Sequence, residues 1–166
     1  MSSSTAAVNH IFLSLCDWRC RFMTLERLLA YAILTHAGFP TGGQYRAALD
    51  QLIRERPGDP LAAELEISSG DLTHSIHLLE QYFQETGGFS LWEFGSFLLQ
   101  EMEGFYDHRK DLRSFSRMVC RAWKLLPVIL QQLQPFRLLY YGSEASLGDE
   151  NSCEEYYLQA FHFFRD

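Results

Sequence analysis

The residues most suited to binding chemistry lie in the segment HRKDLRSFSRMVCRAWKLLP, residues 108–127, where arginines recur at every fourth position. At about 100° per residue, the cations of this segment fall within about 120° on one face of a helix. They are Arg109, Lys110, Arg113, Arg117, Arg121 and Lys124. The other side is apolar and is predicted to pack on a core, with Leu112, Phe115, Val119, Trp123 and Leu126. A guanidinium is a planar fork of donors that suits carboxylates and phosphates, so this face predicts contact with an acidic group.

The charge distribution leaves two kinds of acidic partner open. The chain carries 14 Lys and Arg against 21 Asp and Glu, a net charge of −7. Residues 61–104 hold eight acidic side chains and no Lys or Arg, whereas residues 105–137 hold seven basic and two acidic ones. The cations could pair internally, with residues 61–104 or with the tail GDENSCEE, or they could bind an external protein or nucleic acid. The net charge favours a protein partner over a nucleic acid.

Two clusters have the residue types of metal ligands. Asp71, His74, His77 and Glu80 recur every three residues, but steps of three drift around a helix, so only adjacent pairs share a face. A di-iron bundle would also need a second Glu-x-x-His element, which the sequence lacks. Cys16 and Cys20 could share zinc with His10, but Cys120 and Cys153 form no second close pair. We therefore expect a solvated helix face, reduced thiols, no metal and no cofactor.

Motifs for catalysis are missing. The glycine-rich GFPTGG, residues 38–43, lacks the Gly-Lys-Ser/Thr that binds phosphate and magnesium, so a turn between helices is expected. No Gly-x-Ser-x-Gly element occurs, and Ser96 falls inside a predicted helix. An enzyme would need residues that only the fold brings together, so we do not predict one.

The stretch LAAELEISSGDLTHSIHLLE, residues 61–80, resembles helix-turn-helix transcriptional regulators in its apolar frame. The resemblance implies that the preceding helix at 44–56 completes a trio of helices. It also implies burial of Ala62, Leu65, Ile67, Leu72, Ile76 and Leu79. In that family the exposed face of the second helix touches bases, and here this face would present Thr73, His74 and His77.

This resemblance departs from the family in its turn and its charge. Glu66 stands where the family commonly has a turn glycine. The stretch has four acidic residues and no Lys or Arg, although cations supply most nonspecific affinity for DNA. A DNA-binding regulator is therefore the alternative function, and replacing Thr73, His74 and His77 with alanine is expected to leave the principal activity largely intact.

Helical periodicity dominates the elements that must position these residues. Helices are predicted over 6–22, 25–37, 44–56, 61–67, 71–85, 91–105, 109–134 with a bend near Pro127, and 153–164. Capping boxes are predicted at Ser68 with Asp71 and at Ser90 with Glu93. No segment alternates as a strand does. The sequence thus predicts one all-α domain, residues 1–166, a compact bundle of about seven helices with a flexible tail at 1–5 and a loop at 142–152.

Composition supports a folded chain outside membranes. Hydrophobic residues make up 47% of the sequence, and no apolar run reaches the roughly 18–20 residues that a membrane helix needs. The amino-terminal segment lacks a basic region of the secretory type, which predicts a cytoplasmic protein. We expect a non-catalytic regulatory or adaptor protein, of the inhibitor, immunity or chaperone type, that binds another macromolecule. The sequence leaves its oligomeric state open.

Overall fold

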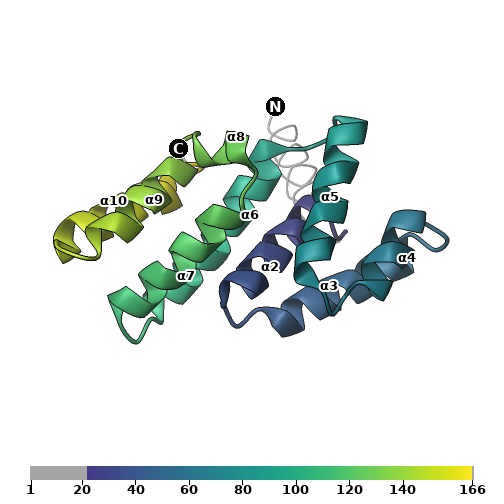
Figure 1. The fold of residues 1–166 in the computed structure, drawn as a ribbon, viewed down its shortest axis with the longest axis horizontal. Coiled ribbons are helices and arrows are strands. Elements are labelled where there is room, and N and C mark those ends of the chain that lie inside the picture. Colours follow the sequence, from purple (N-terminus) through teal and green to yellow (C-terminus); the bar gives the residue numbers. More distant parts are fainter. Residues whose placement is uncertain (1–21, 166) are drawn as a thin grey trace, which may run out of the picture.

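The computed structural model describes residues 22–165, and within that range every regular element is an α-helix (Figure 1). The helices are α2 (Leu25–Ala37), α3 (Gly42–Glu55), α4 (Pro60–Ile67), α5 (Leu72–Thr86), α6 (Leu91–Asp107), α7 (Leu112–Leu125), α8 (Val128–Gln131), α9 (Phe136–Ala145) and α10 (Glu150–His162). The all-α prediction is confirmed, with nine helices in the described part where about seven were expected for the whole chain. The tail at 1–5 and nearly all of the helix predicted for 6–22 lie outside the described residues.

Helix α2 is the centre of the molecule. It packs against α3, α5, α6 and α7, and its side chains are buried on nearly all sides (Figure 1). A helix with apolar residues on nearly all sides is stable only inside a core, and the few polar side chains of α2 find partners on other helices. Its ends match the prediction: the Thr24 hydroxyl accepts a hydrogen bond from the Arg27 amide at 3.3 Å, and Gly38 ends the helix at φ +103°.

A second group of helices, α9 and α10, packs on α6 and α7 at the end of the molecule away from α3 and α4 (Figure 1). Aromatic side chains fill this region, including the fully buried Phe94, Phe115, Phe136 and Tyr157. The Tyr157 hydroxyl donates to the Ser116 hydroxyl of α7 at 2.7 Å, which satisfies both polar groups inside the core. All the buried hydrophobic side chains belong to one continuous cluster, so the described helices share one core.

Gly142 of α9 allows Tyr157 to occupy its place. A Cβ atom at Gly142 would lie 2.5 Å from Cε1 of Tyr157, whose ring is fully buried and whose hydroxyl is held by Ser116. We expect Gly142→Ala to lower the free energy of unfolding by about 1–3 kcal/mol, because neither the ring nor the helix can move freely. Urea denaturation followed by circular dichroism measures the change.

The matched control for this prediction is Gly104→Ala on α6. A Cβ at Gly104 would meet nothing within 4 Å, and the residue is exposed. The same substitution should therefore be stabilising there by up to about 1 kcal/mol, because alanine costs less chain entropy in a helix. Equal effects at both glycines would contradict the contact with Tyr157.

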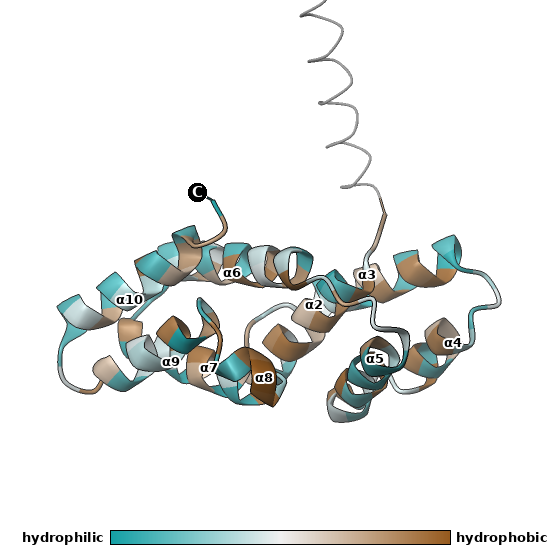
Figure 2. Cartoon of the chain, turned by 90° about the horizontal axis from the view of Figure 1, so that it is seen from above, coloured by the Kyte–Doolittle hydropathy of each residue, from teal (hydrophilic) through white to brown (hydrophobic). Residues whose placement is uncertain are grey.

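Two predictions for the second half of the chain are wrong. The helix expected over 109–134 is divided: α7 ends at Leu125, and Pro127 precedes the four-residue α8, which is strongly hydrophobic (Figure 2). Proline has no amide hydrogen and clashes with the preceding turn, so it ends the helix rather than bending it. The loop expected over 142–152 is also wrong, since α9 continues to Ala145 and α10 begins at Glu150. Gly142 is a packing residue of a helix, not a turn residue.

The predicted capping boxes have a different chemistry in the structure. Asp71 alone caps α5, accepting from the His74 amide at 3.1 Å, whereas Ser68 ends α4. Ser90 does cap α6, accepting from the Glu93 amide at 3.2 Å. The Glu93 carboxylate, however, bonds to Nε of Arg27 at 2.8 Å, and Glu26 accepts from the Ser90 amide at 3.0 Å. These side chains therefore join α2 to α6 instead of closing a local box.

Candidate interaction surface

Helix α7 presents one buried side and one exposed side. Asp111 begins the helix by accepting a hydrogen bond from the Ser114 amide at 2.7 Å. Phe115, Val119 and Leu126 are buried against the core, as the apolar pattern predicted, while the predicted Leu112 and Trp123 are partly buried against it. The helix is thus held from behind, and the side chains on its outer face have a rigid support.

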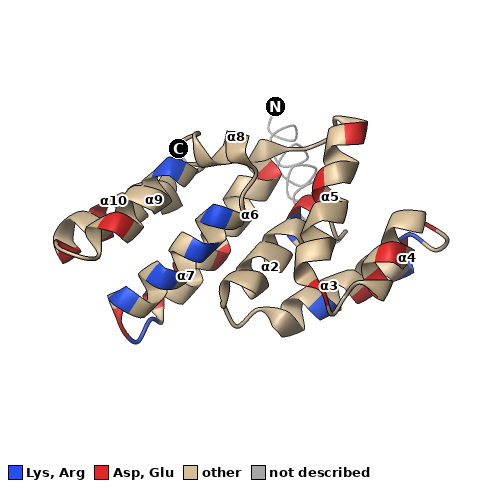
Figure 3. Ribbon diagram, viewed as in Figure 1, with Lys and Arg blue, Asp and Glu red and all other residues tan. Residues whose placement is uncertain are grey.

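Four cations occupy the outer side of α7 and form what we call the α7 basic face: Arg113, Arg117, Arg121 and Lys124 (Figure 3). All four are exposed. Among residues 22–165, none of the four has a carboxylate oxygen within 4.0 Å. At about 1.5 Å per residue the basic face is about 16 Å long. It is a short, rigid row of positive charges without ion-pair partners in the described part of the chain.

The other two predicted members do not belong to this face. Helix α7 begins at Leu112 and is capped by Asp111. Arg109 and Lys110 therefore lie before the helix, where the spacing of about 100° per residue does not apply. The Arg109 guanidinium lies 2.8 Å from the Glu154 carboxylate of α10 and 3.9 Å from the centre of the Tyr106 ring. Arg109 is therefore an internal connection between helices, and Lys110 is an exposed residue of the preceding turn.

Internal pairing, the alternative for these cations, holds for Arg109 but not for the α7 basic face. The carboxylates of residues 61–104 that form ion pairs use other partners. Glu93 pairs with Arg27, Glu103 pairs with Arg165, and the Glu80 carboxylate lies 4.0 Å from Nδ1 of His77. Segments that alternate in charge along a sequence need not be neighbours in a helical bundle.

The charge on the α7 basic face acts on its immediate surroundings. The pKa of Asp111 lies below its usual value, first because of hydrogen bonds from Ser114 and additionally because of attraction to Arg117 and Arg113. Nη1 of Arg121 lies beside Gly38, 3.5 Å from where a Cβ of that residue would be. This places a cation near the C-terminal end of α2, where the helix dipole is negative.

The helix-turn-helix-like stretch is only partly as the resemblance implied. Ala62, Leu65, Ile76 and Leu79 are buried, and Leu72 is half-buried against the core. Ile67 is 87% exposed, so the prediction that it fills the turn is wrong. Helix α4 ends with Ile67, and its last side chain points away from the core because Leu65 already occupies the inner position.

The three residues proposed to read DNA lie on the outer side of α5, and all are exposed. The Thr73 hydroxyl and Nε2 of His36 form a hydrogen bond of 3.1 Å, which connects the start of α5 to the end of α2. His77 is next to Glu80, and neither α4 nor α5 carries Lys or Arg. The stretch therefore has a suitable exposed face but no positive charge of its own.

A groove that sequence reasoning missed separates α5 from the junction of α7 and α8, and we call it the α5–α8 groove. It comprises a hollow of about 520 Å³, lined by residues that include Thr73, His77 and Lys124, and a smaller one of about 230 Å³. The two hollows share Glu80, Gln84, Pro127 and Ile129. The structure thus brings Thr73 and His77 together with Lys124, which the sequence placed in separate candidate sites. Pro127 was the signal, because a helix break there exposes the residues that follow it.

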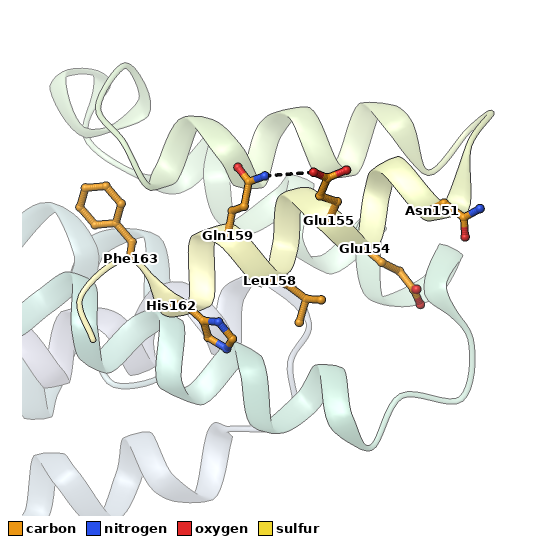
Figure 4. A pocket seen from close by; sticks show the side chains of 7 residues that line it. All are labelled: Asn151, Glu154, Glu155, Leu158, Gln159, His162 and Phe163. Carbon is orange, nitrogen blue, oxygen red and sulfur yellow. Dashed lines mark hydrogen bonds between the residues drawn. The ribbon is translucent and has the colours of Figure 1, made fainter. Parts of the chain in front are cut away.

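Another hollow, of about 790 Å³, is lined by the exposed face of α10 (Figure 4). Leu158 and His162 project towards α6, while Gln159 and Glu155 extend from the other flank and are hydrogen-bonded at 3.4 Å. Glu154, in the same hollow, is already paired with Arg109. The side chains that line it include no Ser, Cys or Lys nucleophile next to a base.

The part of the chain that the structure describes has neither a metal-binding cluster nor a helix that could span a membrane. Residues 22–165 contain no cluster of three or more His, Cys, Asp and Glu arranged to hold a metal. Cys120 and Cys153 are free thiols, and burial raises the pKa of Cys153, whereas His10, Cys16 and Cys20 lie outside the described residues. In the same range, none of the helices has the length and apolar character to span a bilayer. No protein-family model, curated protein or solved structure matches the chain.

Proposed function

We propose that this chain is a non-catalytic regulatory or adaptor protein that binds an acidic surface of another protein through the α7 basic face. The observation that carries the proposal is the exposure of Arg113, Arg117, Arg121 and Lys124 on a helix supported by the core, without ion pairs among the described residues. Such a row costs repulsion between like charges, and a partner carrying carboxylates would relieve it.

Electrostatics favour an acidic partner at this face and not elsewhere. The chain as a whole has a net charge of −7, so an acidic protein would be repelled by most of the molecule and attracted by α7. This arrangement orients the encounter and raises the rate of association. Rigid support also lowers the entropy lost on binding, because the backbone of the site is already ordered.

A protein suits this surface better than a nucleic acid. The α7 basic face is about 16 Å long, and the neighbouring α5 offers exposed His74 and His77 but no Lys or Arg for phosphates. Beside Lys124 lie the exposed apolar side chains of Val128 and Ile129. Apolar contacts next to a cationic rim are typical of protein interfaces. In the alternative, a helix-turn-helix regulator, α5 would be the recognition helix. Because α5 has no Lys or Arg, α7 would have to supply the contacts to phosphates.

Co-purification from the native host tests the proposal. The protein is isolated at low salt, the ratio of absorbance at 260 and 280 nm is recorded, and the molecules that co-elute are identified. We expect a stoichiometric acidic protein, a ratio typical of protein alone, and partial release as salt increases. Nucleic acid with a steep salt dependence would contradict the proposal and support the regulator.

A variant of α5 serves as the control for the same experiment. Thr73→Ala, His74→Ala and His77→Ala combined remove the side chains that would read bases, and all three sites are exposed. The partner should still co-elute with the folded variant. Loss of binding to a defined DNA site would instead assign the principal activity to α5.

A further inference from the structure

We infer that the α5–α8 groove receives an amphipathic helix of the partner, with acidic residues along the flank that faces α7. This inference rests on the proposed function and specifies the shape and charge of the segment that would be bound. Its basis is the position of the groove beside the α7 basic face and the chemistry of its two rims.

The dimensions of the groove suit a short helix. Its α5 wall extends from Thr73 to Gln84, which at about 1.5 Å per residue is about 16 Å, or three helical turns. The smaller hollow is lined by Phe83, Leu130 and Leu29 of the central helix among others, so most of its lining is apolar. An apolar groove between helices favours the helix-in-groove mode of binding, in which side chains one turn apart enter successive hollows.

The α8 rim is an exposed apolar surface. Val128 is 73% exposed and Ile129 is 76% exposed, and both line the larger hollow. They are adjacent in sequence, and Leu130, which follows them, lines the smaller hollow. Other strongly exposed apolar side chains, such as Ile67 and Leu147, line neither hollow. A contiguous apolar surface edged by polar groups is the usual mark of an interaction site.

The two rims carry opposite charges, which determines the orientation of the occupant. Lys124 lines the α7 rim, and Arg121 precedes it by about one helical turn. Glu80 lines the α5 rim beside His77, and burial raises its pKa. An incoming helix would therefore place carboxylates towards α7 and neutral or donor groups towards Glu80. The reversed charge pattern would set carboxylates against Glu80 and cations against Lys124.

Binding of designed helices tests the inference directly. The probes are two synthetic peptides of about 14 residues with the same leucine stripe at helical spacing, one with glutamates along one flank and the other with lysines there. Fluorescence anisotropy measures their affinity for the full chain. We expect the glutamate-flanked peptide to bind at least about ten-fold more tightly. Failure of that peptide to bind, or equal binding of both, overturns the inference.

Substitutions on the α8 and α7 rims of the α5–α8 groove show whether the peptides bind there. Val128→Ser with Ile129→Ser should reduce affinity for the glutamate-flanked peptide at least about ten-fold, because both side chains are exposed in the free protein and available to bury. Leu147→Ser, at an equally exposed site outside the groove, should leave affinity unchanged. Arg121→Glu with Lys124→Glu should reverse the preference, so that the lysine-flanked peptide binds better. A purely structural role for these cations would not produce that reversal.

The outcomes separate this inference from the proposed function. If the co-purified partner is retained by the Val128→Ser, Ile129→Ser variant, the groove is not the docking site, although the α7 basic face can still be. If a short duplex DNA binds and competes with the peptide, the groove serves nucleic acid and the inference fails.

Discussion

Replacing Ile76 with aspartate should lower the free energy of unfolding by about 3–5 kcal/mol, because it removes a buried apolar side chain and buries a carboxylate without a partner. Ile76 is 5% exposed and lies on the side of α5 that faces the hydrophobic core. The same change at Ile67 should alter stability by less than about 0.5 kcal/mol, since that side chain is in solvent. Ile67 is 87% exposed at the end of α4.

This pair of variants isolates the effect of burial. Both replace isoleucine with aspartate in the same helix-turn-helix-like stretch, so composition and net charge change equally. Urea denaturation followed by circular dichroism gives both free energies. Comparable destabilisation by the two substitutions would mean that Ile67 is buried in solution and that the turn closes as the helix-turn-helix frame implied.

Reversing Arg113, Arg117 and Arg121 to glutamate together should abolish binding of the acidic partner. The substitutions replace attraction by repulsion along most of the α7 basic face, and like charges at an interface cost several kcal/mol. Thermal unfolding should shift by no more than about 4 °C, because all three residues are exposed and have no ion pair among the described residues. Co-elution of the partner and differential scanning calorimetry measure the two effects. Lost stability with retained binding would show that the cations have a structural role.

A control at α3 and the residue that follows it shows whether binding depends on the charge at α7 or on the net charge of the protein. Arg46, Arg54 and Arg56 are also exposed, and their reversal to glutamate changes the net charge by the same amount. Two of them form ion pairs at the surface, Arg46 with Asp50 at 3.4 Å and Arg56 with Asp59 at 3.8 Å, which contribute little to stability. This variant should retain the partner. If it loses the partner equally, binding depends on net charge and not on the α7 basic face.

The helices themselves were largely predictable because their signals are local. Ser90 caps α6 as expected, and α2 spans the predicted residues 25–37, between the cap at Thr24 and Gly38. Gly142 shows where local reasoning failed. Glycine is typical of turns, but Gly142 lies inside α9, where the absence of a side chain leaves room for Tyr157 of α10. Pro127 was recognised as an interruption, but the helical pattern did not show that Leu126, the residue before it, adopts extended backbone and so ends the helix.

The candidate surface was predicted in part for the same reason. Spacing within α7 determines that Arg113, Arg117 and Arg121 share a face, since four residues are close to one helical turn. It does not determine that Arg109 reaches Glu154, 45 positions away, because that ion pair depends on how α10 packs. The α5–α8 groove combines residues from α5, α7 and α8, so no single segment of sequence shows it.

The sequence alone determined the all-α class, the placement of most helices and the cationic character of α7, because these follow from propensity, capping and periodicity within a few turns. The tertiary structure decided which charges are satisfied, which apolar residues are buried and where a groove opens. Ile76 and Ile67 have the same side chain in one short stretch, yet one is in the core and the other in solvent. Burial depends on the angle at which helices pack, which is set by every helix contributing to the core rather than by any one of them.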